Sequence, residues 1–446
     1  MRVFDSSREH DTPIDFHTVR KKISESRLPQ VGSSSIREIV RLVNEIERET
    51  GQRFIRMEMG VPGLPPAEVG VEAEIRALRR GVASKYPMIE GVRELKEEIS
   101  RFVKLFLDVD VSPAACVPTV GSMMGSMAAF LTANRNDRYR KGTVFLDPGF
   151  PVQKQQCRIL GHEYESIDVY NCRGEKLKER LESVLAGAAA SSILYSNPNN
   201  PAWICFTEEE LRMIGELSMK YDVIVIEDLA YFGMDYRQDY SRPGSPPFQP
   251  TVARYTDHYI LLISSSKVFS YAGQRVGMLV MSDALYDRHY PDLKRYYSSD
   301  RFGHAMIYGA LYALSSGCSH SAQYALAAML KAANDGEFNF IRSVSEYARR
   351  ASLMKKLFTE NGFHMVYDRD IDRELADGFY FTFSYPGFSG PELLEEMLYY
   401  GISSISLVIT GSRRTEGLRA CVSQVSPDQM PLLEERLKRF HRDHSG

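Results

Sequence analysis

The sequence predicts an α/β protein, with a mostly parallel, doubly wound sheet in a large domain and a smaller α/β domain. Short apolar runs of strand length alternate with stretches of helical periodicity through the middle of the chain, a pattern typical of parallel sheets. Polar residues stand directly after several of these runs, where an open parallel sheet binds its ligands. The length of 446 residues suggests two or three domains.

The N-terminal region begins with a polar, irregular stretch, residues 1–34. Ser35 and Glu38 then have the spacing of a capping box, which marks the start of a helix. Apolar residues follow at helical intervals and form one stripe, typical of a packing helix: Ile36, Ile39, Val40, Val43 and Ile46. Glycines and prolines punctuate residues 55–66, which we interpret as a strand that leads into a loop.

The middle of the chain carries the alternation of strands and helices. We expect strands at residues 143–146, 193–195, 223–227 and 259–264, each a short apolar run. We expect helices at residues 90–107, 121–133, 150–160 and 207–221. Residues 236–252 are rich in proline and glycine and are interpreted as a loop.

The C-terminal part predicts a smaller α/β unit after one long helix at residues 337–361. Its expected elements are a strand at 379–385, a helix at 390–400, a strand at 417–423 and a final helix at 427–441. We therefore predict three segments: residues 1–55 as an N-terminal part of the small domain, 56–320 as the large domain and 321–446 as the C-terminal small domain.

Composition excludes several functional classes. A net charge of -3 gives no electrostatic case for nucleic acid, and no polybasic segment suggests a membrane surface. No apolar run reaches the roughly 18 residues of a membrane span, and residues 1–15 lack the apolar core of a signal peptide. The six cysteines have no CxxC spacing, which predicts thiols in a reducing compartment, with no disulfide frame or metal site. We therefore expect a cytoplasmic protein.

The run from Ser264 to Gly277 is the most informative segment. Three serines crowd against Lys267 after an apolar run, and Arg275 follows between glycines. Hydroxyls and a planar guanidinium suit a phosphate, and a neighbouring cation disfavours the ammonium form of a lysine, which leaves a nucleophilic amine. Such a pair is what a pyridoxal phosphate enzyme requires, although a solvated loop lysine would give the same local pattern.

A second signal stands at the end of the expected strand 223–227. Asp228 at that position can hold a pyridine nitrogen protonated by charge pairing, and a protonated ring is an electron sink for a carbanion. Tyr231 lies three residues further on, within reach of the ring's phenolic oxygen. An aspartate in this place is also compatible with an ordinary turn or helix cap.

Three more segments would complete a pyridoxal phosphate site. Two Asn-Pro pairs follow the strand that ends at Tyr195, and an asparagine fixed in such a loop can donate to an anionic oxygen. Gly121 opens a helix whose bare N–H groups suit a phosphate. Phe150 sits in a turn and can stack on a flat cofactor, though a core phenylalanine would fit equally.

Arg419 interrupts a strand-like run near the C-terminus. An arginine that alternates with apolar residues needs a partner, because burying an unpaired charge is costly. Two partners are open: a structural carboxylate, or the carboxylate of a bound substrate held by two parallel hydrogen bonds.

Taken in chain order, these signals resemble the class I/II aminotransferases, pyridoxal phosphate enzymes of fold type I. The resemblance runs from about Gly60 to the C-terminal helix. The stretch Tyr86-Pro87-Met88-Ile89-Glu90-Gly91-Val92-Arg93-Glu94-Leu95 also looks like the family's tyrosine-to-glycine-to-leucine segment. The resemblance implies the fold type I architecture and pyridoxal 5'-phosphate as the cofactor.

The resemblance also assigns roles to individual residues. Lys267 matches the lysine of the internal aldimine, Asp228 the carboxylate under the ring nitrogen, and Arg275 the phosphate arginine. The other matched cofactor residues are Ser264 and Ser266 beside that arginine, Gly121, Ser122 and Met123 in the helix-start phosphate loop, Tyr231 and Asn200 as donors to the phenolic oxygen, and Phe150 as the stacking ring. On the substrate side, Arg419 matches the α-carboxylate arginine and Gly60 the glycine that lines its site.

One match reaches beyond a single chain. Tyr86 matches a tyrosine that contacts the cofactor phosphate of the neighbouring subunit, so the resemblance implies a homodimer with shared active sites. Lys294 falls near the position that reads a second substrate carboxylate.

The chain departs from the family pattern in places that bear on the site. Met123 replaces a hydroxyl or small residue in the phosphate loop, and Trp203 stands where the Asn-Pro motif has glycine. Ser265 and Tyr271 are atypical of the lysine motif. Residues 405–416 resemble the family's substrate-facing segment only loosely, which points to an unusual substrate.

The implied reaction moves an amino group between an amino acid and a 2-keto acid through the Lys267 aldimine. A carbon–sulfur lyase or a decarboxylase would share Lys267, Asp228 and Arg275, so those reactions stay open, as does a binding module without turnover. The missing G-x-G-x-x-G after the first strand argues against a dinucleotide enzyme. The sequence does not identify the amino donor or the keto acceptor.

Overall fold

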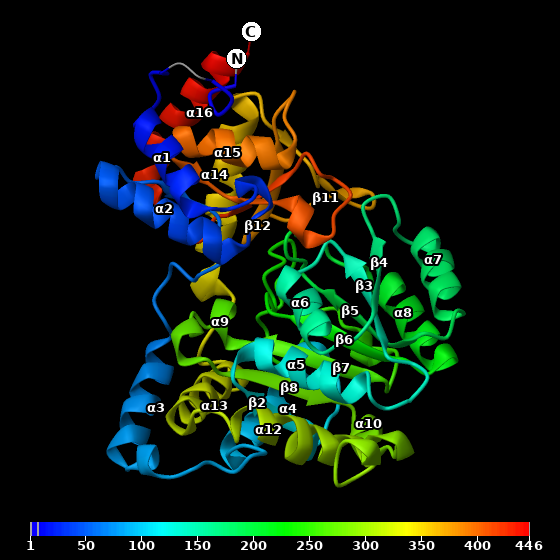
Figure 1. Cartoon of the computed structure of the whole chain (residues 1–446). Coiled ribbons are helices and arrows are strands. Elements are labelled where there is room, and N and C mark those ends of the chain that lie inside the picture. The colour runs from blue at the N-terminus through cyan, green and yellow to red at the C-terminus, as the bar shows by residue number, and fades with distance from the viewer. Residues whose placement is uncertain (1, 7–8, 446) are drawn as a thin grey trace. The chain divides into compact units, whose positions relative to one another are not determined.

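A computed structural model describes residues 2–6 and 9–445, and the chain divides into two compact units. The central unit consists of Leu64–Asn199 and Cys205–Ser345. The terminal unit consists of Met1–Gly63, Asn200–Ile204 and Glu346–Gly446. Figure 1 shows both units, with many of their elements labelled. The boundaries predicted from the sequence, after residues 55 and 320, stay predictions.

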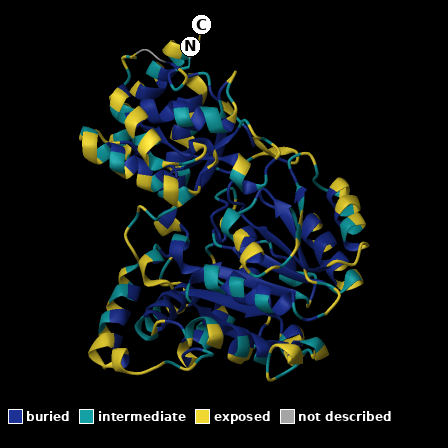
Figure 2. Cartoon of the chain, in the orientation of Figure 1, coloured by how far each residue is buried: buried dark blue, intermediate teal, exposed yellow. Residues whose placement is uncertain are grey.

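The central unit is built on a seven-stranded sheet in the order β2-β8-β7-β6-β5-β3-β4. Its strands are β2 (Cys116–Thr119), β3 (Gly142–Asp147), β4 (Tyr164–Asp168), β5 (Ala190–Ser196), β6 (Ile224–Leu229), β7 (Tyr259–Ser264) and β8 (Gly277–Met281). Only β8 runs against its neighbours β2 and β7; the pairs from β7 to β4 are parallel. Most of the strands are wholly buried, as the dark ribbons of Figure 2 show, which explains their continuous apolar runs.

Helices surround this sheet. They are α3 (Glu68–Arg79), α4 (Arg93–Leu107), α5 (Gly121–Ala133), α6 (Pro151–Ile159), α7 (Glu175–Leu185), α8 (Glu208–Tyr221), α9 (Ser265–Val268), α10 (Asp283–Asp287), α11 (Phe302–His304), α12 (Tyr312–Ser315) and α13 (His320–Asn334). Helix α5 packs on β7 and β8, and α8 packs on β6. The alternation of strands and helices predicted for the middle of the chain is confirmed.

The terminal unit holds a four-stranded antiparallel sheet in the order β14-β15-β12-β9 and a separate parallel pair, β1 with β13. Its strands are β1 (Ile55–Arg56), β9 (His364–Met365), β10 (Arg369–Asp370), β11 (Arg373–Glu374), β12 (Tyr380–Ser384), β13 (Ile402–Ser403), β14 (Ile405–Ser406) and β15 (Leu418–Cys421). Its helices are α1 (Phe16–Ser26), α2 (Ile36–Thr50), α14 (Glu346–Glu360), α15 (Gly390–Tyr399) and α16 (Met430–His444).

Two expected helices compare differently with the structure. The capping box at the start of α2 is confirmed, because the Ser35 N–H donates to Glu38 Oε2 at 2.8 Å while the Ser35 hydroxyl accepts from the Glu38 N–H. The prediction of a long helix at residues 337–361 is wrong at its start, since α14 begins only at Glu346. The side chain of Asn339 accepts from the Arg342 N–H at 2.8 Å and stabilises a turn where the helix was expected. Within the described residues, no helix has the length and apolar character needed to span a bilayer.

Candidate active site

The carboxyl ends of parallel strands bring the predicted catalytic residues of the central unit together. Asp228 is the second-last residue of β6 and pairs with Ser196 on β5 and with Leu262 on β7. Strand β7 ends at Ser264, and the short helix α9 that follows carries Lys267. The charge of Lys267 contributes to lowering the pKa of Asp228, so the two groups act on one another.

Asp228 is a carboxylate enclosed by the protein, with 7% of its surface exposed. Its Oδ2 accepts from Gln153 Nε2 at 2.8 Å, and its Oδ1 accepts from the Ala230 N–H at 3.1 Å. Burial raises the pKa of Asp228 to about 6, against the lowering by these donors and by Lys267. An ionised carboxylate in this place therefore gains from any cation that binds beside it.

Glu227, the preceding residue, is buried even more completely. Its Oε2 accepts from the Thr251 hydroxyl and from the Val252 N–H at 3.1 Å. Burial raises the pKa of Glu227 to about 7. Because successive strand residues point to opposite faces of a sheet, Glu227 and Asp228 are held in different surroundings.

The start of α5 and the end of the lysine segment form a cradle that fits a phosphate. A Cβ at Gly121, whose φ is +66°, would collide with the guanidinium of Arg275. A Cβ at Gly277 would lie 3.0 Å from the Ser122 nitrogen. Glycines thus let an arginine approach the free N–H groups of a helix N-terminus, a combination that binds phosphate through charge and hydrogen bonds.

Two buried hydroxyls lie in the same lysine segment. The Ser264 hydroxyl caps α9 by accepting from the Ser266 N–H at 3.1 Å, and both serines are buried. Arg275 also donates from Nη1 to the Ala272 carbonyl at 2.9 Å, which fixes part of its guanidinium.

The other predicted cofactor residues of the central unit occupy the ends of its elements. Phe150 is the N-cap of α6 and is half-buried, and Tyr231 is a buried residue just beyond β6. The carbonyl of Met123, in the first turn of α5, accepts from Gln156 Nε2 at 2.8 Å. Lys294 forms an exposed ion pair with Asp300 at 3.1 Å, so its predicted role in reading a second carboxylate stays a prediction.

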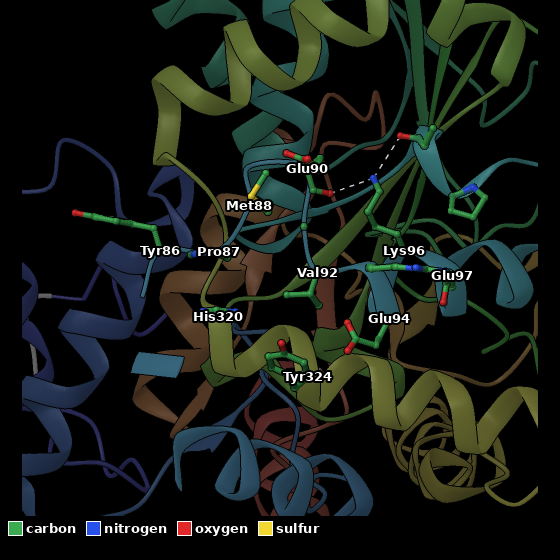
Figure 3. Close-up of a pocket in the computed structure, with 14 residues that line it drawn as sticks. Tyr86, Pro87, Met88, Glu90, Val92, Glu94, Lys96, Glu97, His320 and Tyr324 are labelled. Atoms are coloured by element: carbon green, nitrogen blue, oxygen red, sulfur yellow. Dashed lines mark hydrogen bonds and ion pairs between the residues drawn. The ribbon is translucent and has the colours of Figure 1, made fainter. Parts of the chain in front are cut away.

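Tyr86 stands apart from these groups, with 91% of its surface exposed. It lies at a cavity of about 600 Å³ whose lining includes Met88, Lys96, His320 and Tyr324. Figure 3 shows its side chain directed away from the other labelled residues.

The terminal unit holds the predicted substrate residues. Arg419, on the inner strand β15, is 1% exposed. Its guanidinium donates to Asn200 Oδ1 at 3.2 Å and to the Glu58 carbonyl, while no acceptor for its Nε–H is found in the part of the chain that the structure describes. No ion pair to Arg419 is present among the residues that the structure describes. Of the two partners left open by the sequence, the structural carboxylate is therefore absent from the described part of the chain.

Gly60 lies in the same unit, where a Cβ would collide with the hydroxyl of Tyr380. The Tyr380 ring packs on Arg419, which also donates a hydrogen bond to Asn200. Gly60, Asn200 and Arg419 therefore belong to one group of contacts.

Sequence reasoning missed Gln153 and Tyr380. Gln153 stands one helical turn after Phe150 and contacts Asp228, and Tyr380 packs on Arg419. The residue types and their spacing in the sequence do not predict these two contacts, because each contact joins segments that are distant in the chain.

Comparison with known proteins decides the family. The model of the aminotransferase class I and II family matches residues 53–437. The chain belongs to that family. It is 26% identical over 264 residues to a probable aspartate aminotransferase of Methanocaldococcus jannaschii, a match that covers 58% of this chain and 64% of the relative. It is 28% identical over 236 residues to the LL-diaminopimelate aminotransferase of Aquifex aeolicus, covering 52% and 58%. These matches span less than two thirds of the relatives' own length.

Solved structures share the fold of this aminotransferase family member. The aspartate aminotransferase of Thermotoga maritima superposes with a TM-score of 0.72 at 19% identity, covering 95% of this chain and 99% of the other. An aspartate aminotransferase double mutant of Thermus thermophilus gives a TM-score of 0.72 at 18% identity, covering 95% and 98%. The predicted fold type I architecture is confirmed.

We predict that Glu227→Gln raises stability at alkaline pH. The folded pKa of Glu227, about 7, lies above the ordinary value of about 4.3, so its contribution to stability is full below pH 4 and is lost as pH rises towards 7. Glutamine does not titrate. We expect the thermal midpoint of the variant minus that of wild type, both measured without cofactor, to be higher at pH 8 than at pH 5 by roughly 3 °C or more.

The exposed Glu216→Gln on α8 is the matched control and should show no such pH-dependent difference. If the difference in thermal midpoint between Glu227→Gln and wild type stays constant from pH 5 to pH 8, the raised pKa of Glu227 is contradicted.

Proposed function

We propose that this chain is a pyridoxal phosphate-dependent aminotransferase that moves an amino group between an amino acid and a 2-keto acid. The observation that carries the proposal is the buried Asp228 at the end of β6, coupled to Lys267 just beyond the end of the neighbouring strand. Membership of the aminotransferase class I and II family supports the same conclusion.

The residues of the central unit fit this cofactor. Lys267 would hold its aldehyde carbon, Asp228 its ring nitrogen and Phe150 one face of its ring. The phosphate would bind at Arg275, Ser264 and Ser266 and at the start of α5, formed by Gly121, Ser122 and Met123. Tyr231 would donate to the phenolic oxygen, and the family resemblance assigns the same role to Asn200 of the terminal unit. When bound, the cofactor supplies an electron sink for the negative charge that develops at the substrate's α-carbon.

The chain's own residues then perform three tasks. The Lys267 amine, freed by the incoming amino acid, takes the proton from the α-carbon. Asp228, as a carboxylate, keeps a proton on the ring nitrogen by charge pairing. Arg419 binds the α-carboxylate and fixes the substrate's orientation, with Gly60 beside it.

Arg419 indicates the chemical class of the substrate and does not identify the individual compound. A buried guanidinium without a carboxylate partner among the described residues suits an α-amino acid. The relatives named above are a probable aspartate aminotransferase and an LL-diaminopimelate aminotransferase, which supports an amino-acid donor. A panel of amino donors with 2-oxoglutarate, pyruvate and oxaloacetate identifies the pair. Release of pyruvate and ammonia without a keto acid would identify a lyase instead.

We also propose a homodimer with shared active sites. Tyr86 is almost fully exposed, and other large side chains near it in sequence or on the same unit are exposed as well: Met88, Tyr308 and Tyr312. A second copy that covers these groups would remove apolar surface from water. The proposed cytoplasmic location is supported by the sequence, whose six cysteines have no CxxC spacing.

We predict that Lys267→Ala abolishes transamination, since no amine remains to hold the cofactor or move the α-proton. Borohydride reduction of the wild type, followed by peptide mapping, should place the cofactor's mass on the peptide that contains Lys267. The exposed Lys220→Ala serves as control and should keep normal activity. Turnover of Lys267→Ala near the wild-type rate would overturn the mechanism.

We predict that Asp228→Ala lowers kcat by about a hundredfold or more, because the ring nitrogen loses the charge that keeps it protonated. The measurement is a steady-state assay with saturating cofactor. Asp239→Ala, a change in an exposed loop of the same unit, should leave kcat intact. An unchanged rate for Asp228→Ala would count against the role of the carboxylate.

We predict that two impaired variants complement one another. Tyr86→Ala should retain the cofactor about tenfold less well, because it lacks a hydrogen bond to the phosphate in the other subunit. Mixing it with Lys267→Ala, after dissociation and reassociation, should form hybrids with one intact site. An equal mixture should recover about a quarter of wild-type activity. No recovery, or a fully active monomer by light scattering, would refute the shared site.

A further inference from the structure

Trp203 has a backbone conformation that a large side chain rarely adopts. Its φ is +65°, in the left-handed region that is unfavourable for an L-residue. The residue lies in the short segment Asn200–Ile204 of the terminal unit and is the only tryptophan of the sequence. A strained, bulky residue persists only where its surroundings hold it in place, and such residues cluster at functional sites.

Packing in the terminal unit holds the indole in this conformation. Trp203 is fully buried, and a Cβ at Gly378 would collide with its ring. The indole also meets the ring of Tyr380 at an interplanar angle of 72°, with the centroids 6.1 Å apart. This edge-to-face geometry is favourable between aromatic rings.

Tyr380 in turn supports Arg419. The guanidinium carbon of Arg419 lies 4.4 Å from the centroid of the tyrosine ring. Sheet register explains the contact: Arg419 pairs with Thr382 on β12, so Tyr380, two residues away, lies diagonally across on the same face. The hydroxyl of Tyr380 occupies the space that a Cβ at Gly60 would need.

The chain of contacts closes on the loop that carries Trp203. Arg419 Nη1 donates to Asn200 Oδ1, three residues before Trp203, and Nη2 donates to the Glu58 carbonyl. The guanidinium is therefore fixed by one aromatic face and two oxygen acceptors, while its Nε–H has no acceptor among residues 2–6 and 9–445. A planar cation held in this way loses little conformational freedom when a carboxylate binds.

We propose that Trp203 and Tyr380 form an aromatic brace that positions Arg419 to bind the α-carboxylate of the substrate. The inference rests on the proposed function and adds two positioning residues to it. Trp203 acts through Tyr380 and through the turn that carries Asn200. The brace sets the preference for substrates that bear a carboxylate next to the amino group, over amines that lack it.

The test compares L-alanine with ethylamine, which lacks only the carboxylate, in single half-reactions of the holoenzyme. Each ligand's apparent Kd is read from the concentration dependence of the cofactor's absorbance change. In Trp203→Gly the left-handed turn is retained, because glycine adopts that φ readily, while the indole is lost. The Kd for L-alanine should rise tenfold or more and that for ethylamine by less than twofold.

Matched variants separate positioning from general damage. Tyr380→Leu removes the ring under Arg419 and should reproduce the tenfold loss, whereas Tyr380→Phe keeps the ring and should stay within twofold of wild type. Phe358→Leu, a buried aromatic in the same unit, should lower the thermal midpoint without changing the preference for L-alanine. If Trp203→Gly does not fold, the Tyr380 pair decides the matter.

Three results would overturn the brace. The first is that both variants, Trp203→Gly and Tyr380→Leu, bind L-alanine as tightly as wild type does. Another is a loss of equal size for L-alanine and ethylamine, which would indicate a structural role alone. The third is a wild type without preference for L-alanine, which would overturn the assignment of Arg419 as well, and so identifies a failure of the proposed function itself.

Discussion

The burial of an ionisable carboxylate at the end of β6 is the constraint around which the central unit is organised. Within the described residues, the Asp228 side chain accepts hydrogen bonds from Gln153 and from the Ala230 N–H, and burial raises its pKa to about 6. Folding alone gains nothing from such a group, because removing a carboxylate from water is costly. The cost is offset when a cationic ring binds beside it. The parallel register that brings Lys267 close to Asp228 turns this burial into a site.

The terminal unit contains the opposite case, a buried cation. Arg419 is 1% exposed, and its contacts in the described residues are oxygen acceptors and an aromatic face, with no carboxylate. Each unit thus encloses a charge whose natural partner is a small molecule: a protonated ring nitrogen for Asp228 and a carboxylate for Arg419. Pyridoxal phosphate offers such a ring nitrogen and an α-amino acid offers such a carboxylate, so each charge by itself agrees with the proposed aminotransferase activity.

The sequence could predict the parts that depend on local pattern. Alternating strands and helices, and polar residues such as Asp228 and Lys267 directly after apolar runs, follow from periodicity and from the geometry of parallel sheets. The contacts of Gln153 and Tyr380 could not be predicted, since they join segments that are distant in the chain. Trp203 was visible only as a departure from a glycine. Its meaning depends on its contacts with Gly378 and Tyr380, and on the pairing of β12 with β15, which brings Tyr380 close to Arg419.

The most direct test of this account is the protonation state of the ring nitrogen in the bound cofactor. Its ¹⁵N chemical shift, measured at pH 8 with labelled pyridoxal phosphate, reports whether the nitrogen carries a proton. The account predicts a protonated nitrogen in the wild type and an unprotonated nitrogen in Asp228→Asn, whose amide matches the carboxylate in shape but lacks its charge. The same shift in both proteins would contradict the claim that the buried carboxylate at the end of β6 controls the chemistry.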